Sequence, residues 1–497
     1  MSLAIVHSRA QIGVEAPAVT IEAHLANGLP ALTLVGLPEA AVKESKDRVR
    51  SAILNSAFDY PNRRITLNLA PADLPKDGGR FDLAIALGIL AASGQVPCAS
   101  VADYECLGEL ALSGAVRPVQ GVLPAALAAR DAGRTLLVPQ ANAEEASLAS
   151  GLKVIAVEHL LQVAAHLNGS APLQPYVAQG LLRQTLPYPD LAEVQGQLAA
   201  KRALLVAAAG SHNLLLSGPP GTGKTLLASR LPGLLPPLDE SEALQVAAIH
   251  SVASHAPLQH WPQRPFRTPH HSASGPALVG GGSRPQPGEI TLAHMGVLFL
   301  DELPEFDRKV LEVLREPLES GHIVIARARD KVRFPARFQL VAAMNPCPCG
   351  YLGDPSNRCR CTPEQIQRYR GRLSGPLLER IDLHLTVARE STALEVAPQD
   401  GESTAQAAAK VAMARDRQLQ RQGVANAFLD LPGLRQHCAL QPTDRQWLEN
   451  ACERLGLSLR AAHRVLKVAR TLADLAQEPQ ISRAHLAEAL QYRPSVG

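Results

Sequence analysis

The chain has 497 residues, of which 46% are hydrophobic and 19% are charged, so it is long enough for about three domains with buried cores. Its formal net charge of +3 excludes a broadly basic nucleic-acid-binding protein, so any contact with nucleic acid must come from local basic patches. No stretch has the length and hydrophobicity of a membrane span, and the first residues lack the pattern of a secretion signal. We therefore expect a cytoplasmic protein without a membrane partner.

The N-terminal third has the pattern of a mixed domain. Residues 1–168 alternate between strand-like and helix-like stretches, with a strand expected at Ile65–Leu69 and a helix at Phe81–Ala92. Residues 169–189 contain four prolines and show little periodicity. This composition predicts a linker between the first domain and the rest of the chain.

The most specific motif follows in residues 218–225, which fit the pattern G-x-x-x-x-G-K-[ST]. A strand is expected before it at residues 213–217 and a helix after it at residues 225–231, so backbone N–H groups at the turn between them can bind phosphate. The expected ATP contacts are Gly218, Pro219, Pro220, Gly221, Thr222, Gly223, Lys224 and Thr225. Lys224 would reach the β- and γ-phosphates, and the Thr225 hydroxyl would bind Mg²⁺. A plain glycine-rich turn is the alternative, and the flanking elements argue against it.

A second motif supplies carboxylates. Val297–Leu300 is typical of a strand buried on both faces, and Asp301 and Glu302 follow it directly. Carboxylates at the C-terminal end of such a strand lie where open α/β sheets bind ligands. We expect Asp301 to hold Mg²⁺ and Glu302 to polarise the attacking water. Alone, an Asp-Glu pair would be an ordinary solvated loop.

A basic segment lies further along. Residues 327–333 separate two β-prone runs, Ile323–Ile325 and Val332–Phe334, which predicts a hairpin with a basic tip. A second basic cluster comprises Arg358, Arg360, Arg368, Arg370 and Arg372. Such runs are often solvated faces, but on a protruding hairpin they suit contact with a phosphate backbone.

Four of the eight cysteines form two C-x-C pairs. These are Cys347, Cys349, Cys359 and Cys361. Four thiolates that converge in a cytosolic protein favour tetrahedral Zn²⁺ over disulfides. The usual ligand spacing is C-x₂-C, so a tight loop of reduced cysteines is the alternative. From Ser403 onward the spacing of apolar residues is helical, and Asp430–Gly433 is expected to form a turn.

Three runs carry a family resemblance: Arg264–Ser272, Pro287–His294 and Leu373–Asp382. With the two motifs above, they resemble the magnesium-chelatase-like AAA+ ATPases, and the whole chain resembles the ComM/YifB proteins within that group. The resemblance implies an α/β fold, with an AAA+ P-loop core, a C-terminal helical lid and a preceding Lon-protease-like (ribosomal S5 domain 2-like) α+β domain. The implied boundaries are 1–168 for that first domain, 169–189 for the linker, 190–392 for the core with its helix-2 insert and pre-sensor-1 hairpin, and 393–497 for the lid.

The resemblance also implies roles for single residues. Asn345 matches the polar sensor that orients the attacking water, and Arg380 matches an arginine finger that acts on ATP bound by a neighbouring subunit. For Arg380, a surface arginine at a helix end is the alternative. Arg460 matches the second sensor in the lid, with Arg464 as its alternative. A finger that acts in trans implies a ring of subunits.

Further contacts follow from the same resemblance. Gln197, with Val194, is expected near the adenine. An insertion within residues 255–296, made flexible by the glycines at 280–282, and the basic hairpin would grip DNA. The expected DNA contacts are Arg327, Arg329, Lys331 and Arg333. Because His270 and His271 are adjacent and cannot point the same way on regular structure, we expect structural or ring-contact roles for them rather than metal binding.

The N-terminal domain resembles the proteolytic domain of Lon-type proteases, particularly at Pro75–Asp82 and Leu107–Gly114. That chemistry needs a serine activated by a lysine. Arg80 and Phe81 stand where the serine would follow the Asp-Gly motif, and Gln120–Ala126 contains no lysine. We therefore expect an inactive module for assembly or DNA contact.

For the whole chain, the resemblance implies a hexameric, ATP- and Mg²⁺-dependent DNA motor or helicase that promotes branch migration during natural transformation. Its partners would be single-stranded, double-stranded or branched DNA, and a recombinase filament. A protein-remodelling or chelatase-type motor that works with a partner protein, and an ATP-driven protease, are the alternatives, because the ATP motifs serve all of these equally.

Overall fold

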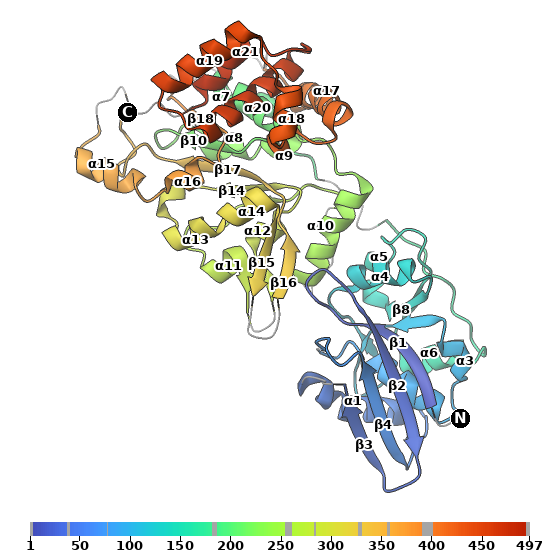
Figure 1. Cartoon of the computed structure of the whole chain (residues 1–497). Coiled ribbons are helices and arrows are strands. Elements are labelled where there is room, and N and C mark those ends of the chain that lie inside the picture. The colour runs from blue at the N-terminus through green and yellow to red at the C-terminus, as the bar shows by residue number, and fades with distance from the viewer. Residues whose placement is uncertain are drawn as a thin grey trace.

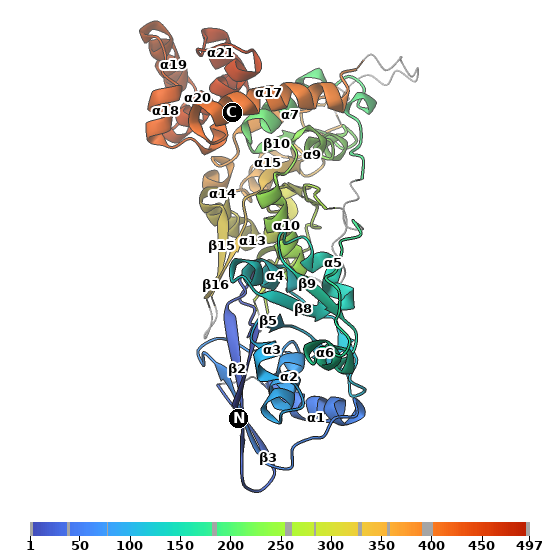
Figure 2. The same ribbon diagram turned by 90° about the vertical axis from the view of Figure 1, so that its right-hand side faces the viewer.

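The computed structural model describes residues 3–36, 40–76, 78–180, 186–253, 261–282, 285–326, 331–354, 358–389 and 401–493, with only the backbone at 40–43. Figures 1 and 2 show an elongated molecule in which an N-terminal domain, a central α/β core and a C-terminal group of helices follow one another along the long axis. This mixed architecture, with a parallel sheet in the core and helices at the C-terminus, confirms the predicted fold class.

The N-terminal domain is built on a seven-stranded sheet of order β3-β4-β2-β1-β5-β8-β9. Its strands are β1 (Leu3–Arg9), β2 (Ala18–Ala26), β3 (Ala31–Val35), β4 (Arg64–Ala70), β5 (Tyr104–Cys106), β8 (Thr135–Pro139) and β9 (Val154–Val157), and a separate pair joins β6 (Glu109–Leu110) to β7 (Val116–Arg117). Its helices are α1 (Ala40–Asn55), α2 (Asp82–Ala92), α3 (Cys98–Val101), α4 (Val122–Asp131), α5 (Ala143–Ala146) and α6 (Leu160–Leu167). Every residue of α2 is buried, because this apolar helix packs between the sheet and α1.

The position of the missing protease residues is filled by Arg80. Its side chain is buried, and it donates hydrogen bonds to Gln11 Oε1 at 3.0 Å and to the carbonyl of Gln120 at 3.3 Å. The arginine thus ties the Asp-Gly segment to the loop in which a Lon-type protease would carry its lysine. The expectation of an inactive module stays a prediction.

The core holds a five-stranded, all-parallel sheet of order β11-β14-β17-β10-β18. These strands are β10 (Leu214–Ser217), β11 (Phe266–Arg267), β14 (Val297–Leu300), β17 (Gln339–Met344) and β18 (Leu383–Thr386), and smaller pairs are formed by β12 (Gly280–Gly281) with β13 (Gln286–Pro287) and by β15 (His322–Ala326) with β16 (Lys331–Pro335). All residues of β14 and β17 are buried, as expected for strands covered on both faces. The C-terminal ends of β10, β14 and β17 therefore meet at one edge of the sheet.

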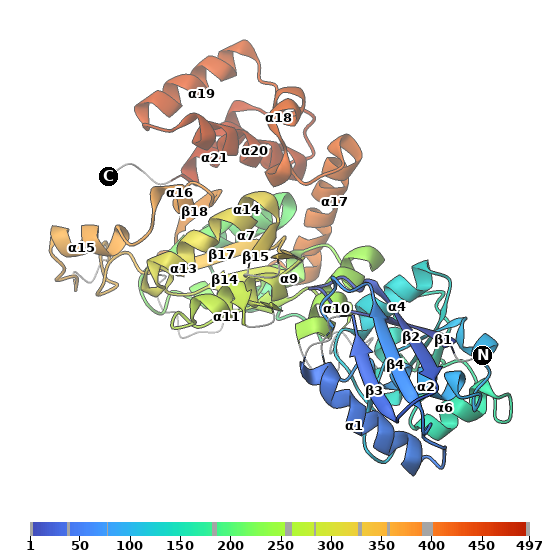
Figure 3. The same cartoon turned by 60° about the horizontal axis from the view of Figure 1, so that its bottom comes forward.

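Helices surround this sheet and form the C-terminal region (Figure 3). Those of the core are α7 (Leu198–Gly210), α8 (Lys224–Ala228), α9 (Leu231–Leu234), α10 (Glu240–Ala253), α11 (Gly275–Val279), α12 (Glu289–Leu292), α13 (Arg308–Val313), α14 (Arg315–Ser320), α15 (Pro363–Arg370) and α16 (Gly375–Leu378). Those of the lid are α17 (Thr404–Gln422), α18 (Leu431–His437), α19 (Pro442–Arg454), α20 (Leu459–Leu475) and α21 (Arg483–Gln491). Helices α17 and α20 share one hydrophobic core with α7 and β10, which anchors the lid to the core domain. No helix within the described ranges combines the length and hydrophobicity needed to cross a membrane.

Two local expectations were wrong. The helix expected over residues 225–231 ends at Ala228, and a separate turn, α9, follows. Pro232 and Gly233 lie in that turn, and neither favours the continuation of a helix. The turn expected at Asp430 is instead the start of α18, where the Asp430 side chain accepts a hydrogen bond from the Gly433 N–H at 2.8 Å.

The N-terminal domain contacts the core at two places. Leu123 and Leu148 pack against Ala243, Ala247 and Trp261, close to where α4 meets α10 in Figure 2. The loop between β1 and β2 packs its apolar side chains into the core cluster that contains the β15–β16 hairpin. A Cβ added at Gly13 of this loop would lie 2.6 Å from Val332 Cγ1, so only glycine fits there.

Candidate active site

The phosphate loop joins β10 to α8. Gly221 and Gly223 have φ angles of +78° and +79°, which other residues rarely adopt, so the glycines allow the loop to turn back over the end of the sheet. The Thr222 hydroxyl donates to the Pro219 carbonyl at 3.0 Å and closes the loop. A Cβ at Gly218 would lie 2.3 Å from the Val387 carbonyl oxygen, so this glycine is needed for close approach to the neighbouring strand. The turn between strand and helix has the form expected of a loop that binds phosphate.

Lys224 and Thr225 connect this loop to the other predicted catalytic residues. Lys224 Nζ donates to the carbonyls of Gly218 and Pro219 at 2.7 and 2.9 Å, and to Asn345 Oδ1 at 3.3 Å. Burial lowers the pKa of Lys224, while Asp301 and Glu302 act in the opposite direction. The Thr225 hydroxyl donates to Asp301 Oδ2 at 2.7 Å. A hydroxyl and a carboxylate at this distance are hard oxygen ligands of the kind that Mg²⁺ prefers, so the residues fit a Mg-nucleotide.

Glu302 lies next to Asp301 and is held by a residue that the sequence did not place here. Its backbone is left-handed, with φ +52°, and its carboxylate lies 3.1 Å from His271 Nδ1. The His270 and His271 rings pack against each other, with centroids 4.1 Å apart, an arrangement that regular structure would not allow. The reason is that the histidines follow β11 in a turn rather than in regular structure. The signal that could have located His271 is its position just after β11, which runs parallel to β14 and ends at the same edge of the sheet.

The residue expected near the adenine is also close to the phosphate loop. Gln197 caps the start of α7 with φ +49°, and its Nε2 donates to the Ala388 carbonyl at 3.0 Å. Ala388 follows Val387, whose carbonyl touches Gly218. Val194 is buried three residues earlier. The structure therefore brings Gln197 to the P-loop edge of the sheet.

The basic hairpin is present, and its charges point outward. In β16 the exposed Lys331 and Arg333 alternate with the buried Val332 and Phe334. The two strands extend from the core in Figure 1. Arg327 and Arg329 lie outside the described residues. In the second basic cluster, Arg372 donates a hydrogen bond to Glu305 at 2.7 Å.

The four cysteines of the C-x-C pairs come together after β17. The sulfur of Cys347 lies 3.4 Å from that of Cys349 and 3.7 Å from that of Cys359, and those of Cys349 and Cys359 are 3.6 Å apart. Together with Cys361, all four sulfurs lie within 4.8 Å of one another. The Tyr351 backbone N–H, followed by the Cys347 and Cys361 thiols, lowers the pKa of Cys349 to about 6. Four sulfurs this close together have the arrangement of ligands that could hold one metal ion.

Arg380 lies at the opposite edge of the sheet from the phosphate loop. Its carbonyl accepts a hydrogen bond from Asn213 Nδ2 at 3.0 Å, and Asn213 precedes β10, whose other end enters the loop. The four residues of β10 at about 3.3 Å each separate the two edges by about 13 Å, more than the length of an arginine side chain. The Arg380 guanidinium donates to the Pro376 carbonyl at 2.6 Å and forms an ion pair with Glu319.

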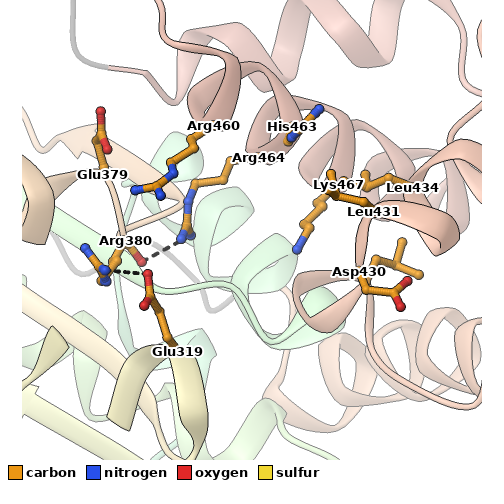
Figure 4. Close-up of a pocket in the computed structure, with 11 residues that line it drawn as sticks. Glu319, Glu379, Arg380, Asp430, Leu431, Leu434, Arg460, His463, Arg464 and Lys467 are labelled. Atoms are coloured by element: carbon orange, nitrogen blue, oxygen red, sulfur yellow. Dashed lines mark hydrogen bonds and ion pairs between the residues drawn. The ribbon is translucent and has the colours of Figure 1, made fainter. Parts of the chain in front are cut away.

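Arg380 shares a pocket of about 290 Å³ with cations of the lid helix α20 (Figure 4). The pocket is lined by Arg380, Arg460, His463, Arg464 and Lys467, together with Glu319, Glu379 and residues of the α18 region. Figure 4 shows Arg460 and Arg464 directed toward Arg380. The predicted finger and the predicted second sensor are therefore neighbours, both far from the phosphate loop of their own chain.

Arg460 and Arg464 differ in their contacts. Arg464 Nη1 donates to Asp382 Oδ1 at 2.5 Å and to the Arg380 carbonyl at 3.3 Å. Burial opposes ionisation of Asp382, but Arg464 and then His212 hold the pKa of this carboxyl below its usual range. Arg460 is exposed at the pocket. Arg464 thus fixes the core to the lid, and Arg460 is the arginine available to a ligand.

Comparisons with known proteins agree with this architecture. Residues 190–394 match the family described as magnesium chelatase, subunit ChlI; residues 21–142 match subunit ChlI of Mg-chelatase; and residues 401–493 match the C-terminal part of subunit ChlI. The chain is 54% identical over 503 residues to competence protein ComM of Haemophilus influenzae, covering 100% of this chain and 98% of that protein.

Two further relatives differ widely in their similarity to this chain. Uncharacterized protein YifB of Escherichia coli is 53% identical over 497 residues, covering 99% of this chain and 97% of that protein. The magnesium-chelatase 38 kDa subunit of Rhodobacter capsulatus is 27% identical over 196 residues, covering 35% of this chain and 55% of that subunit. The full-length matches and the geometry of the core lead to one conclusion: the chain belongs to the ComM/YifB family of magnesium-chelatase-like AAA+ proteins.

Proposed function

We propose that the protein is a ring-forming ATPase, a hexamer, which moves along DNA and drives branch migration of recombination intermediates during natural transformation. The observation that carries the proposal is the division of the catalytic residues between two edges of one sheet. Lys224, Thr225, Asp301 and Asn345 meet at one edge, whereas Arg380 lies at the other. From there Arg380 can act only on ATP bound by another copy, and a head-to-tail contact of this kind forms a ring when the rotation between subunits closes.

Within one site, the residues divide the work as follows. Bound Mg²⁺ supplies electrostatic stabilisation to the phosphates. Thr225 and Asp301 would hold the ion, and Lys224 would exchange its contacts with the loop carbonyls for contacts with phosphate oxygens. Glu302 polarises the attacking water after release from His271, and Asn345 orients that water. Arg380 and Arg460 of the next subunit stabilise the charge that develops on the phosphoryl group.

The DNA track is supported by the outward charges of the β15–β16 hairpin. Exposed Lys331 and Arg333 on one face of a strand can neutralise phosphates without reading base sequence, which suits a motor that moves along any DNA. The name of the Haemophilus relative, a competence protein, points to DNA uptake or recombination as the process. We extend the proposal to single-stranded, double-stranded and branched DNA, to a recombinase filament as partner and to a cytoplasmic location.

A second candidate is a chelatase-type or protein-remodelling motor. It is favoured by the 27% identity to the 38 kDa magnesium-chelatase subunit, which covers only part of this chain. Because the catalytic residues would serve either motor, the track must be identified by experiment. Proteolysis is a weaker alternative, since Arg80 fills the position of the protease dyad.

The test is ATP-driven movement of a synthetic four-way DNA junction by purified protein. We expect branch migration and DNA-stimulated ATP hydrolysis with the wild type, and neither with Lys224→Ala, which still binds DNA. The double variant Lys331→Ala with Arg333→Ala should keep its basal hydrolysis and lose the stimulation. ATP hydrolysis that is indifferent to DNA, with no movement of the junction, would exclude the DNA motor and favour the chelatase-type motor.

A further inference from the structure

We propose that Cys347, Cys349, Cys359 and Cys361 bind one Zn²⁺ ion, and that this ion holds the catalytic edge of the ATPase in place. In a tetrahedral site with Zn–S bonds of about 2.3 Å, neighbouring sulfurs are about 3.8 Å apart. The three distances measured between the first three sulfurs are 3.4, 3.7 and 3.6 Å. The protein thus already holds these sulfurs at nearly the edge length of a zinc tetrahedron.

Other sulfur chemistry fits this cluster less well. A disulfide would require a sulfur separation of about 2.05 Å. An iron–sulfur cluster holds its cysteines on several irons joined by sulfides, which spreads the cysteine sulfurs over a larger volume than a group within 4.8 Å of one another. Four soft thiolates around a single point select Zn²⁺ among the common divalent metals.

The position of the cluster gives the ion a role in catalysis. Cys347 follows Asn345 by two residues, at the end of β17. Gly350, with φ +84°, lies within the loop, and a Cβ at this position would be 2.8 Å from Pro220 Cδ of the phosphate loop and 3.7 Å from Asn345 Cγ. The cysteine loop therefore packs against both the phosphate loop and the sensor residue. Closing this loop with a metal restricts Asn345, which contacts Lys224 at 3.3 Å.

The role in catalysis rests on the proposed ATPase, whereas the metal site does not. Elemental analysis of protein purified without added metal should give one zinc per chain. Cys98→Ser, which changes an exposed cysteine elsewhere, should keep the zinc, and Cys359→Ser should lose most of it. A mercurial reagent can also release the zinc from the wild type, and a metallochromic dye then measures the zinc content. This measurement needs no variant that must fold.

The outcomes separate the two claims. After zinc release, ATP hydrolysis should fall at least about tenfold, while a fluorescent ATP analogue still binds and circular dichroism is retained. Absence of zinc, or iron in its place, overturns the metal site. Zinc release without loss of hydrolysis overturns its catalytic role. Zinc at one per chain in a protein that never hydrolyses ATP leaves the metal site standing and refutes the proposed function.

A separate contact leads to a second inference: Glu319 is a positioning residue that restrains Arg380 until DNA binds. The Arg380 side chain is only 9% exposed, whereas that of Glu319 is 59% exposed. Nη2 of Arg380 pairs with Glu319, Nη1 donates to the Pro376 carbonyl, and Nε is buried without a hydrogen-bond partner. Arg380 must reach a neighbouring subunit, but here its side chain is held within its own subunit. In this arrangement its Nε–H group has no hydrogen-bond partner.

The Glu319 carboxylate is connected to the basic hairpin by the backbone. Glu319 lies in the last turn of α14, and Gly321, with φ +70°, leads directly into β15. The Gly321 N–H donates to the Pro317 carbonyl, and the Ala336 N–H donates to the Gly321 carbonyl, both at 2.9 Å. Both ends of the hairpin are therefore fastened to the end of α14. A shift of the hairpin on DNA displaces Glu319 and releases Arg380.

This inference rests on the proposed roles of Arg380 and the hairpin. We expect Glu319→Gln to raise ATP hydrolysis without DNA by about two- to fivefold, the scale of one partly exposed ion pair, with DNA affinity unchanged. The fold-stimulation by DNA should fall accordingly. Glu316→Gln, an exposed glutamate on the same helix, is the matched control and should change neither rate.

Two results distinguish failure of the latch from failure of the proposed function. If Glu319→Gln leaves the ratio of the rates with and without DNA unchanged, or lowers both in parallel, Glu319 does not restrain the finger. If Arg380→Ala hydrolyses ATP at the wild-type rate, Arg380 is not a finger, and the proposed shared site is refuted together with the latch.

Discussion

A mixture of two inactive variants tests whether each ATP site is shared between subunits. Lys224→Ala removes the cation of the phosphate loop, and Arg380→Ala removes the cation at the opposite edge of the sheet, about 13 Å away along β10. Each variant alone should be inactive, because each lacks one of these two cations. For Arg380→Ala, loss of an arginine finger should lower kcat by about 10³- to 10⁵-fold.

Rings assembled from equal amounts of the two variants should recover activity. A site is complete only when its phosphate loop comes from an Arg380→Ala chain and its finger from a Lys224→Ala chain, so random assembly makes about one quarter of the interfaces intact. The assay is steady-state phosphate release after the subunits have been mixed in dissociated form and reassembled. We expect up to about a quarter of the wild-type rate.

The matched control is Lys224→Ala mixed with the double variant Lys224→Ala/Arg380→Ala. No chain in that mixture supplies Lys224, so it should stay inactive. If the test mixture is no more active than the sum of its two components, the two residues act within one chain, and the argument from the opposite edges of the sheet is refuted.

Three further variants test individual contacts. Arg464→Ala should lower the free energy of unfolding by about 3 kcal/mol at pH 7, because it removes the arginine that forms an ion pair with the buried Asp382. Arg460→Ala should not lower it. The folded-state pKa of Asp382 is depressed, so the ion pair stabilises the protein fully above the unfolded-state pKa of about 4. This stabilisation is lost as the pH falls through the folded-state pKa. Denaturant titrations should therefore show a smaller difference in unfolding free energy between the wild type and Arg464→Ala at pH 3 than at pH 7. His271→Ala removes the partner of Glu302 and should change kcat while the Kd for ATP stays constant, which a parallel measurement of hydrolysis and binding would show. Phe334→Ala should lower the free energy of unfolding by about 3–5 kcal/mol, because removal of this fully buried ring leaves a cavity under the hairpin. An unfolding midpoint unchanged from the wild type would contradict that packing.

Local patterns were enough to predict much of the site. The strand, glycine-rich turn and helix around Lys224 were predicted because their signals lie within about a dozen consecutive residues. The strand before Asp301 was equally readable, because a short apolar run indicates a strand that is buried on both faces. The β-prone runs on either side of the basic residues likewise indicated the hairpin. The predictions were wrong in segments whose side chains show no periodic pattern. The end of α8 at Ala228, and the helix that starts at Leu431, depend on single capping and turn residues.

The sequence by itself determined the fold class and the family, because these depend on residue type and local spacing. Only the tertiary structure decided which motifs share a site. Parallel strand order brought Thr225 to Asp301 and carried Arg380 to the opposite edge. The fold also set Arg464 of α20 beside Asp382, and Arg380 beside Glu319 of α14. The two residues of each pair are about 60 to 80 positions apart in the sequence, so no periodic pattern could predict that they meet. In two of the pairs one charged member is buried, Asp382 or Arg380, and such a group requires a partner that only the fold supplies.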